Sequence, residues 1–103
     1  MYIRRNEETN MKNDILLEAI KEVAEKYVKD NVKVKVYKTE PKDYFRQYTL
    51  QLDYNNIHTL YRLYSQRVKS EFYIMRVVSD LCIELAEMTQ KERNYFFKRS
   101  DEQ

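Results

Sequence analysis

The clearest pattern of hydrophobic and polar positions lies between Phe72 and Met88. At about 100° per residue, most of its apolar side chains fall on one arc about 180° wide, and most charged ones fall opposite. The apolar arc consists of Ile74, Met75, Val77, Val78, Leu81, Cys82, Leu85, Ala86 and Met88. This arc is wider than the stripe of an ordinary surface helix, so we predict a central helix around which the other elements pack.

Three further elements are predicted before residue 55. Residues 14–29 separate apolar from charged side chains onto two sides, which indicates a second amphipathic helix. Residues 32–38 and 46–54 alternate apolar and polar side chains instead, as strands with one buried face do. We expect these strands to pair antiparallel. An isolated two-stranded ribbon is marginally stable in water, so helices should cover one of its faces.

Residues 57–88 have two interpretations. The apolar positions 57, 61, 64, 68, 75, 78, 82 and 85 follow a coiled-coil-like seam, which favours one continuous helix. A rod over residues 56–88 would be about 50 Å long, more than the diameter of a compact domain of this size. Either the chain bends between Ser65 and Glu71 into a helical hairpin whose second helix is capped by Ser70, or the rod persists and buries its overhang in a homodimer. We favour the persistent rod and the homodimer.

The C-terminal segment predicts one more short helix. Thr89 and Glu92 have the spacing of a capping box, which places the helix start at Gln90. Residues 95–97 are three consecutive aromatics that cannot all face one core, so we expect at least one to be exposed or to contact a partner. Residues 1–11 are polar and aperiodic, which predicts a mobile tail. We expect residues 12–99 to form a single domain and residues 100–103 to be a frayed end.

The predicted fold class is therefore α+β: a helix, a two-stranded antiparallel ribbon, a long central helix and a short C-terminal helix. A chain of 103 residues has room for one modest core. Its 19 basic and 17 acidic residues leave a net charge of +2, so any charged binding site must be local. We find no apolar run of about 20 residues and no secretory signal, and we expect a cytoplasmic protein that does not enter a membrane.

Composition argues against most enzyme classes. The chain has no glycine, so the P-loop, the dinucleotide-binding fingerprint and the nucleophile elbow are all missing. Cys82 and His58 are the only cysteine and histidine, which leaves too few ligands for thiolate zinc sites or histidine-pair metal sites. We expect a buried, inert thiol, a solvated imidazole, and a protein that is not an enzyme and holds no cofactor or metal. The residue bias is typical of AT-rich coding regions, as in low-GC bacteria and their phages.

Arg67 and Glu71 fall within the apolar arc if the helix is continuous, at i,i+4 spacing. Charged groups on such a surface need partners. We interpret them as a polar pair, with each other or with their symmetry copies, that fixes the register of a dimer. The alternative is a buried carboxylate for acid–base chemistry, but no second catalytic group accompanies it.

Two binding functions follow from these patterns. We expect a small accessory or regulatory protein that forms a homodimer and binds another protein through exposed aromatic and apolar residues. Its contact residues would be Phe72, Ile83, Tyr95, Phe96 and Phe97. The alternative is nucleic-acid binding, because tyrosines interleave with basic residues that could meet phosphates. These basic residues are Lys33, Lys35, Lys38, Arg62 and Arg67.

Overall fold

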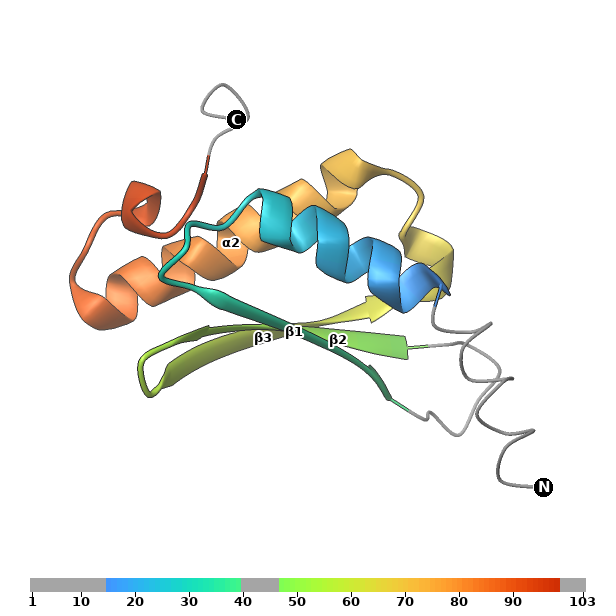
Figure 1. Cartoon of the computed structure of the whole chain (residues 1–103), viewed down its shortest axis with the longest axis horizontal. Helices are drawn as coiled ribbons and strands as arrows, with labels where there is room; N and C mark the ends of the chain where they lie inside the picture. The colour runs from blue at the N-terminus through green and yellow to red at the C-terminus, as the bar shows by residue number, and fades with distance from the viewer. Residues whose placement is uncertain (1–14, 40–46, 99–103) are drawn as a thin grey trace.

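The computed structural model describes residues 15–39 and 47–98. They form an α+β fold in which two helices lie on one face of a three-stranded antiparallel sheet (Figure 1). Within these residues, no helix covers the other face of the sheet. The predicted tail at residues 1–11 and the predicted frayed end at residues 100–103 lie outside the described residues.

The N-terminal helix spans residues 15–26 within the described chain, which confirms the predicted helix but ends it three residues before the predicted end at Lys29. Ile20 and Ala24 are buried on one side, while Glu18 and Glu25 are exposed on the other. The separation of apolar and charged residues therefore determines which side of this helix faces the sheet.

The first two strands confirm the predicted antiparallel pair. They are β1 (Lys33–Thr39) and β2 (Gln47–Tyr54). Val34 lies opposite Leu52 and Val36 lies opposite Leu50, and both leucines are completely buried beneath the helices. The period-two alternation thus places the apolar side chains of both strands on the face that the helices cover.

Residues predicted to begin the long helix form a third strand instead. This strand, β3 (Ile57–Tyr64), pairs antiparallel with β2 and gives the order β1-β2-β3. The predicted two-stranded ribbon and the coiled-coil seam through residues 57, 61, 64 and 68 are therefore wrong. Pairing with β3 satisfies the backbone groups along the second edge of β2, which a helix would have left without partners. A three-stranded sheet is also more stable than a ribbon of two strands.

The β2–β3 turn explains how a hairpin forms in a chain without glycine. Asn55 and Asn56 connect the strands, and Asn55 has a φ of 54°. Two-residue hairpin turns require such left-handed backbone angles, and asparagine adopts them more readily than most other residues. The usual hairpin signal, asparagine followed by glycine, is absent here, so the turn is harder to recognise.

The central helix is confirmed as α2 (Glu71–Thr89). The Ser70 Oγ accepts a hydrogen bond from the Tyr73 N–H at 3.2 Å and so caps the helix start. Before it, the 3-10 turn η1 (Ser65–Arg67) leads out of β3, so neither the continuous rod nor the helical hairpin forms. The buried positions of α2 are Ile74, Val77, Val78, Leu81, Cys82, Leu85 and Ala86.

The end of α2 corrects the predicted capping box. The Thr89 hydroxyl donates to the Leu85 carbonyl at 2.7 Å, so Thr89 closes α2 and does not cap a new helix. Gln90 follows with a left-handed φ of 58°, the conformation that commonly ends a helix. The predicted C-terminal helix is reduced to the 3-10 turn η2 (Arg93–Tyr95).

The segment after η2 returns to the N-terminal helix. The Lys29 N–H donates to the Phe96 carbonyl at 2.8 Å, and the Lys98 N–H donates to the Tyr27 carbonyl at 2.7 Å. These bonds flank a bridge between Val28 and Phe97. The C-terminal segment therefore closes one end of the helix layer.

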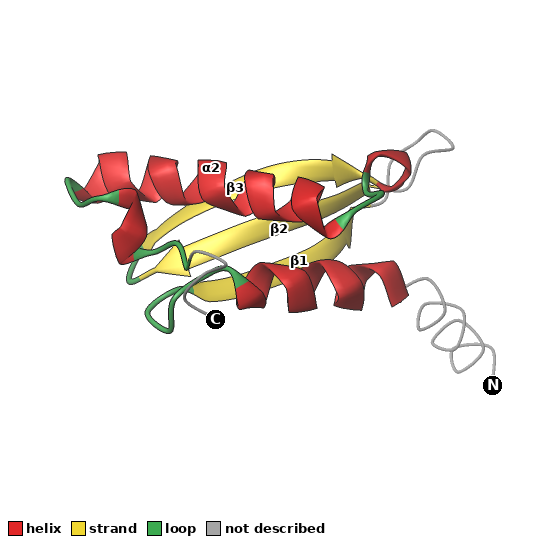
Figure 2. Ribbon diagram, turned by 90° about the horizontal axis from the view of Figure 1, so that it is seen from above, coloured by secondary structure: helices red, strands yellow, loops and turns green. Residues whose placement is uncertain are grey.

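The layers are clearest from above (Figure 2). The N-terminal helix runs beside β1 and α2 runs over β3, so both edges of one sheet face are covered. The buried Thr59 on β3 donates to the Leu81 carbonyl of α2 at 3.4 Å, which joins the two layers by a hydrogen bond. No helix in the described part of the chain is long and apolar enough to cross a membrane.

Candidate functional site

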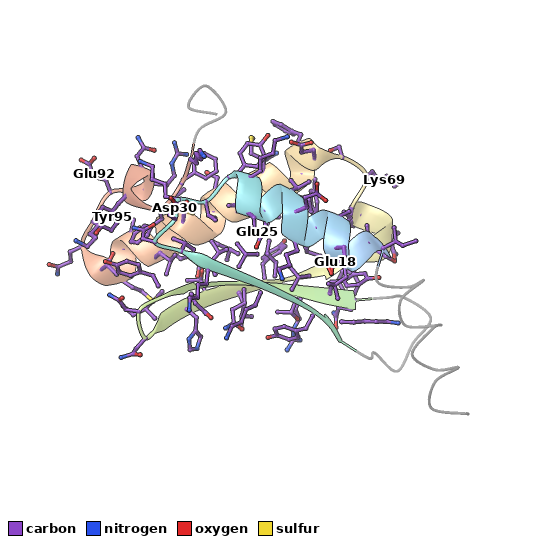
Figure 3. All side chains as sticks on the ribbon, in the orientation of Figure 1. Glu18, Glu25, Asp30, Lys69, Glu92 and Tyr95 are labelled. Atoms are coloured by element: carbon purple, nitrogen blue, oxygen red, sulfur yellow. The ribbon has the colours of Figure 1, made fainter. Side chains whose placement is uncertain are left out.

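The open face of the sheet is the candidate site, and we use this name for the strand side chains that point away from the helices. Figure 3 shows side chains projecting from the sheet on the side opposite the helix layer. By strand alternation and register, the open face consists of Lys33, Lys35, Tyr37, Gln47, Thr49, Gln51, Asp53, His58, Leu60, Arg62 and Tyr64.

The strand register arranges this face in rows. Lys33 and His58 flank Asp53 in one row, and Tyr37 and Arg62 flank Thr49 in another. Adjacent strands lie about 4.8 Å apart, so side chains within a row are close neighbours. The pairing of β3 with β2 is what brings the basic residues of β1 onto one surface with Arg62.

A hydrogen-bond network holds the middle of the open face. The Tyr37 hydroxyl donates to the Gln51 Oε1 at 3.2 Å, and the Gln51 Nε2 donates to the Asp53 Oδ1 at 2.8 Å. The Lys35 Nζ lies 3.1 Å from the Asp53 Oδ2. Burial alone would raise the pKa of Asp53, but the Gln51 hydrogen bond and the Lys35 contact outweigh it and lower this pKa. An ionised Asp53 therefore fixes the orientation of the network.

Charge is divided unevenly between the two layers. The three strands contain four basic residues and one acidic residue, Asp53. The helices over residues 15–26 and 71–89 contain three basic and seven acidic residues. The strands are thus net positive and the two helices net negative, and a polyanion would be attracted to the basic residues of the open face.

The open face also exposes apolar and aromatic surface. Tyr37 is 45% exposed and Leu60 is 47% exposed, and Tyr64 and His58 are exposed as well. The sequence does not predict Leu60 and Tyr64 as site residues, because a helix over residues 57–64 would place both on its apolar side, and it predicts His58 only as a solvated imidazole. The sequence signal that could have identified them is the Asn55-Asn56 pair between two runs rich in aromatic and β-branched residues.

The residues predicted to bind nucleic acid divide into two groups. Lys33, Lys35 and Arg62 share the open face. Lys38 lies opposite the buried Tyr48, on the helix-facing side of β1, and Arg67 lies in η1. The structure therefore brings together three of the five.

The residues predicted to contact a protein partner do not form one patch. Phe72 is 61% exposed, and Ile83 is also exposed. Tyr95 is exposed near the opposite end of α2 from its start. Phe96 and Phe97 are buried within the chain, which corrects the expectation that they offer a contact surface. They are buried because the C-terminal segment folds back onto the N-terminal helix.

The proposed pairing of Arg67 with Glu71 is replaced by other contacts of Glu71. The Lys26 Nζ lies 2.7 Å from the Glu71 Oε1, and the Tyr27 hydroxyl donates to the same oxygen at 3.1 Å. The Lys26 hydrogen bond, and then that of Tyr27, lower the pKa of the Glu71 carboxyl. Glu71 thus links α2 to the end of the N-terminal helix and does not lie in a helical seam.

The buried cysteine is a poor candidate for chemistry. Cys82 is fully buried, as predicted, and burial raises the pKa of its thiol to about 12. A thiol with this pKa carries almost no thiolate at neutral pH, so it is a poor nucleophile. Among the described residues, no group of three or more histidine, cysteine, aspartate or glutamate side chains could hold a metal ion.

The fold and the open face define a small α+β protein with two helices on one side of a three-stranded antiparallel sheet. No protein-family model, curated protein or solved structure matches the chain.

Proposed function

We propose that this protein is a non-enzymatic binding protein and that its open face binds single-stranded nucleic acid. The observation that supports this proposal is the composition of one surface. Lys33, Lys35 and Arg62 share it with exposed tyrosines, and Asp53 is the single acid among its described residues. The acidic side chains of the two helices lie on the other side of the sheet, so a polyanion would favour the open face over the helix surfaces.

Tyr37 and Tyr64 provide the surface on which bases would stack. They lie two strands and one row apart, which places their anchor points about 12 Å from each other. Two different bases would therefore stack on the two rings, while Lys33 and Arg62 contact phosphates. Single strands expose base faces for stacking and duplexes do not, so we expect single-stranded DNA or RNA to bind better than a duplex.

The proposed location is the cytoplasm, where nucleic acid is available. A chain with one cysteine has no internal disulfide to gain from an oxidising compartment. Among the described residues the open face offers a binding surface of basic and aromatic side chains, so we propose an accessory or regulatory role.

Fluorescence anisotropy with labelled single-stranded oligonucleotides at several salt concentrations tests the proposal. Each phosphate contact with a single strand contributes about −0.7 to the log–log salt slope, so the contacts of Lys33 and Arg62 predict a slope of about −1.4. Loss of one stacked base costs about 1–3 kcal/mol, so Tyr37→Ala and Tyr64→Ala should each weaken binding by roughly 5- to 150-fold. No binding by the wild-type protein at low salt would refute the proposal.

Two arginines provide a matched comparison. Arg62 lies on the open face, and Arg76 is an exposed arginine of α2. Arg62→Ala should weaken binding and reduce the salt slope by about 0.7, whereas Arg76→Ala should leave both unchanged. Equal effects of the two substitutions would show that the attraction does not depend on the open face.

The Asp53→Asn variant tests the proposal by an expected gain in nucleic-acid affinity. Asparagine keeps an acceptor for Gln51 but removes the negative charge that is paired with Lys35. The released Lys35 becomes available to a phosphate, so the variant should bind more tightly and show a steeper salt slope. Weaker binding by this variant would contradict an electrostatic role for the open face.

A protein partner is the second candidate, and a flank of α2 favours it. Phe72 and Ile83 are eleven residues apart, which places their side chains within about 20° of each other around the helix. Both are exposed. If this flank binds a partner, Phe72→Asp with Ile83→Asp should abolish co-purification of that partner, and Arg62→Ala should retain it. Retention of the partner by the double variant would exclude this flank of α2 as the partner-binding site.

A further inference from the structure

The outer edge of β3 is a strand edge without the usual protection. Within the described residues, β3 pairs only with β2. Alternate residues of an edge strand direct their N–H and C=O groups away from the sheet, so half of its eight residues present unpaired backbone groups. The strand also exposes Leu60, Tyr61 and Tyr64.

The two edges of the sheet differ in charge. β1 contains Lys33, Lys35 and Lys38, and lysines on an edge discourage pairing with another strand. β3 contains Arg62 as its one permanently charged residue and has neither lysine nor proline. A long apolar edge of this kind is a surface for strand addition.

We propose that β3 pairs antiparallel with β3 of a second copy of this chain, which forms a symmetric dimer with one continuous six-stranded sheet. The order would be β1-β2-β3 followed by β3-β2-β1 of the partner. In an antiparallel pair, opposed residues point to the same face. The two helix layers therefore lie on one side of the joined sheet, and the two open faces lie on the other.

The distribution of charge favours pairing of two β3 edges over pairing of two β1 edges. Joining two β1 edges would bring the lysines of both copies together, whereas joining β3 edges separates the two β1 strands by five strand spacings, about 24 Å. Like charges directly opposed across strands are destabilising. The β3 edges bring apolar side chains together instead, near Leu60 and Tyr61 of each copy.

The dimer does not depend on what the open face binds. If the open face does bind nucleic acid, pairing at β3 doubles the length of the positive surface and brings the two Arg62 side chains toward its centre. Measurements of dimerisation without nucleic acid and of nucleic-acid binding can therefore fail separately.

Sedimentation of the full chain over a micromolar concentration series tests the proposal, with Leu60→Lys and Tyr37→Lys as matched variants. Both residues point to the open face and have similar exposure, 47% and 45%, but they lie on opposite edge strands. Leu60→Lys introduces the charge twice in a symmetric interface and should weaken dimerisation by about a hundredfold or more. Tyr37→Lys should leave it unchanged.

A second measurement does not depend on the lysine substitutions. Leu60→Cys places two thiols near the dimer axis, where mild oxidation should link them into a covalent dimer, and Tyr37→Cys should form none. Cys82 is buried and will not compete. A wild-type monomer throughout the series, or a dimer that Tyr37→Lys disrupts and Leu60→Lys does not, would overturn the proposal.

Discussion

Phe96 provides the sharpest test of how the C-terminal segment contributes to the fold. Its side chain is completely buried, and its ring lies 4.9 Å from that of Tyr54 and 5.0 Å from that of Tyr95, both in edge-to-face orientation. Removing a buried phenylalanine costs about 3–5 kcal/mol through lost burial and the cavity that remains. Small domains are stabilised by only about 5–15 kcal/mol, so Phe96→Ala should remove a large part of the free energy of unfolding.

Urea unfolding followed by circular dichroism measures this loss. With a slope of about 2 kcal/mol per M, a loss of 4 kcal/mol lowers the midpoint by about 2 M. Phe72→Ala is the matched control, because it removes the same side chain from an exposed site and should change stability by less than about 0.5 kcal/mol. Equal midpoints for the two variants would show that the C-terminal segment does not belong to the core.

Four smaller predictions follow from single contacts. Ser70→Ala removes the cap of α2 and should cost about 1 kcal/mol in the same urea assay, with Ser70→Asp retaining most of the stability. Gln90→Gly should stabilise the protein by up to about 1 kcal/mol, because Gln90 has a left-handed φ that glycine adopts without strain, and Gln90→Ala should not. Cys82 should react with a thiol reagent only after unfolding, because its pKa is about 12 and its side chain is buried. The pKa of Asp53 lies below its usual 3.8, so ionised Asp53 stabilises the fold at pH values above 3.8. This stabilisation should disappear in an acid titration as the pH falls through the lowered pKa, and the Asp53→Asn variant should not show this loss of stability.

The sequence is sufficient to predict four of the elements because each has one mainly apolar side and one polar or charged side. The N-terminal helix, β1, β2 and α2 bury most of the apolar residues that their periodicity indicates, although Ile15 and Met88 are exposed. The spatial arrangement of these elements cannot be predicted from the same local patterns. Lys33 and Arg62 are 29 positions apart in the chain, and they share a surface only because β2 lies between their strands. No local pattern contains that information.

The C-terminal segment shows a second limit of local reasoning. The Thr89 hydroxyl can cap a following helix or bond back to the Leu85 carbonyl, and both use the same short-range chemistry. The bridge between Val28 and Phe97 decides the outcome, because it draws the chain back across the N-terminal helix. The sequence therefore predicts Phe96 and Phe97 as contact residues, whereas the fold buries both in the hydrophobic core.

The exposed apolar residues of β3 explain both why this strand resembles a helix in the sequence and why its edge and the open face are proposed as binding surfaces. A strand with a polar outer face shows a clear alternation, as residues 32–38 do, but β3 buries Thr59 and Leu63 while it exposes Leu60, Tyr61 and Tyr64. Apolar residues on both faces remove the period of two and leave spacings of three and four, which resemble a helix. Exposed apolar side chains on an edge strand are costly for a monomer unless something covers them. Leu60, Tyr61 and Tyr64 make β3 resemble a helix in the sequence. A second copy of the chain, or a ligand on the open face, would cover these same residues.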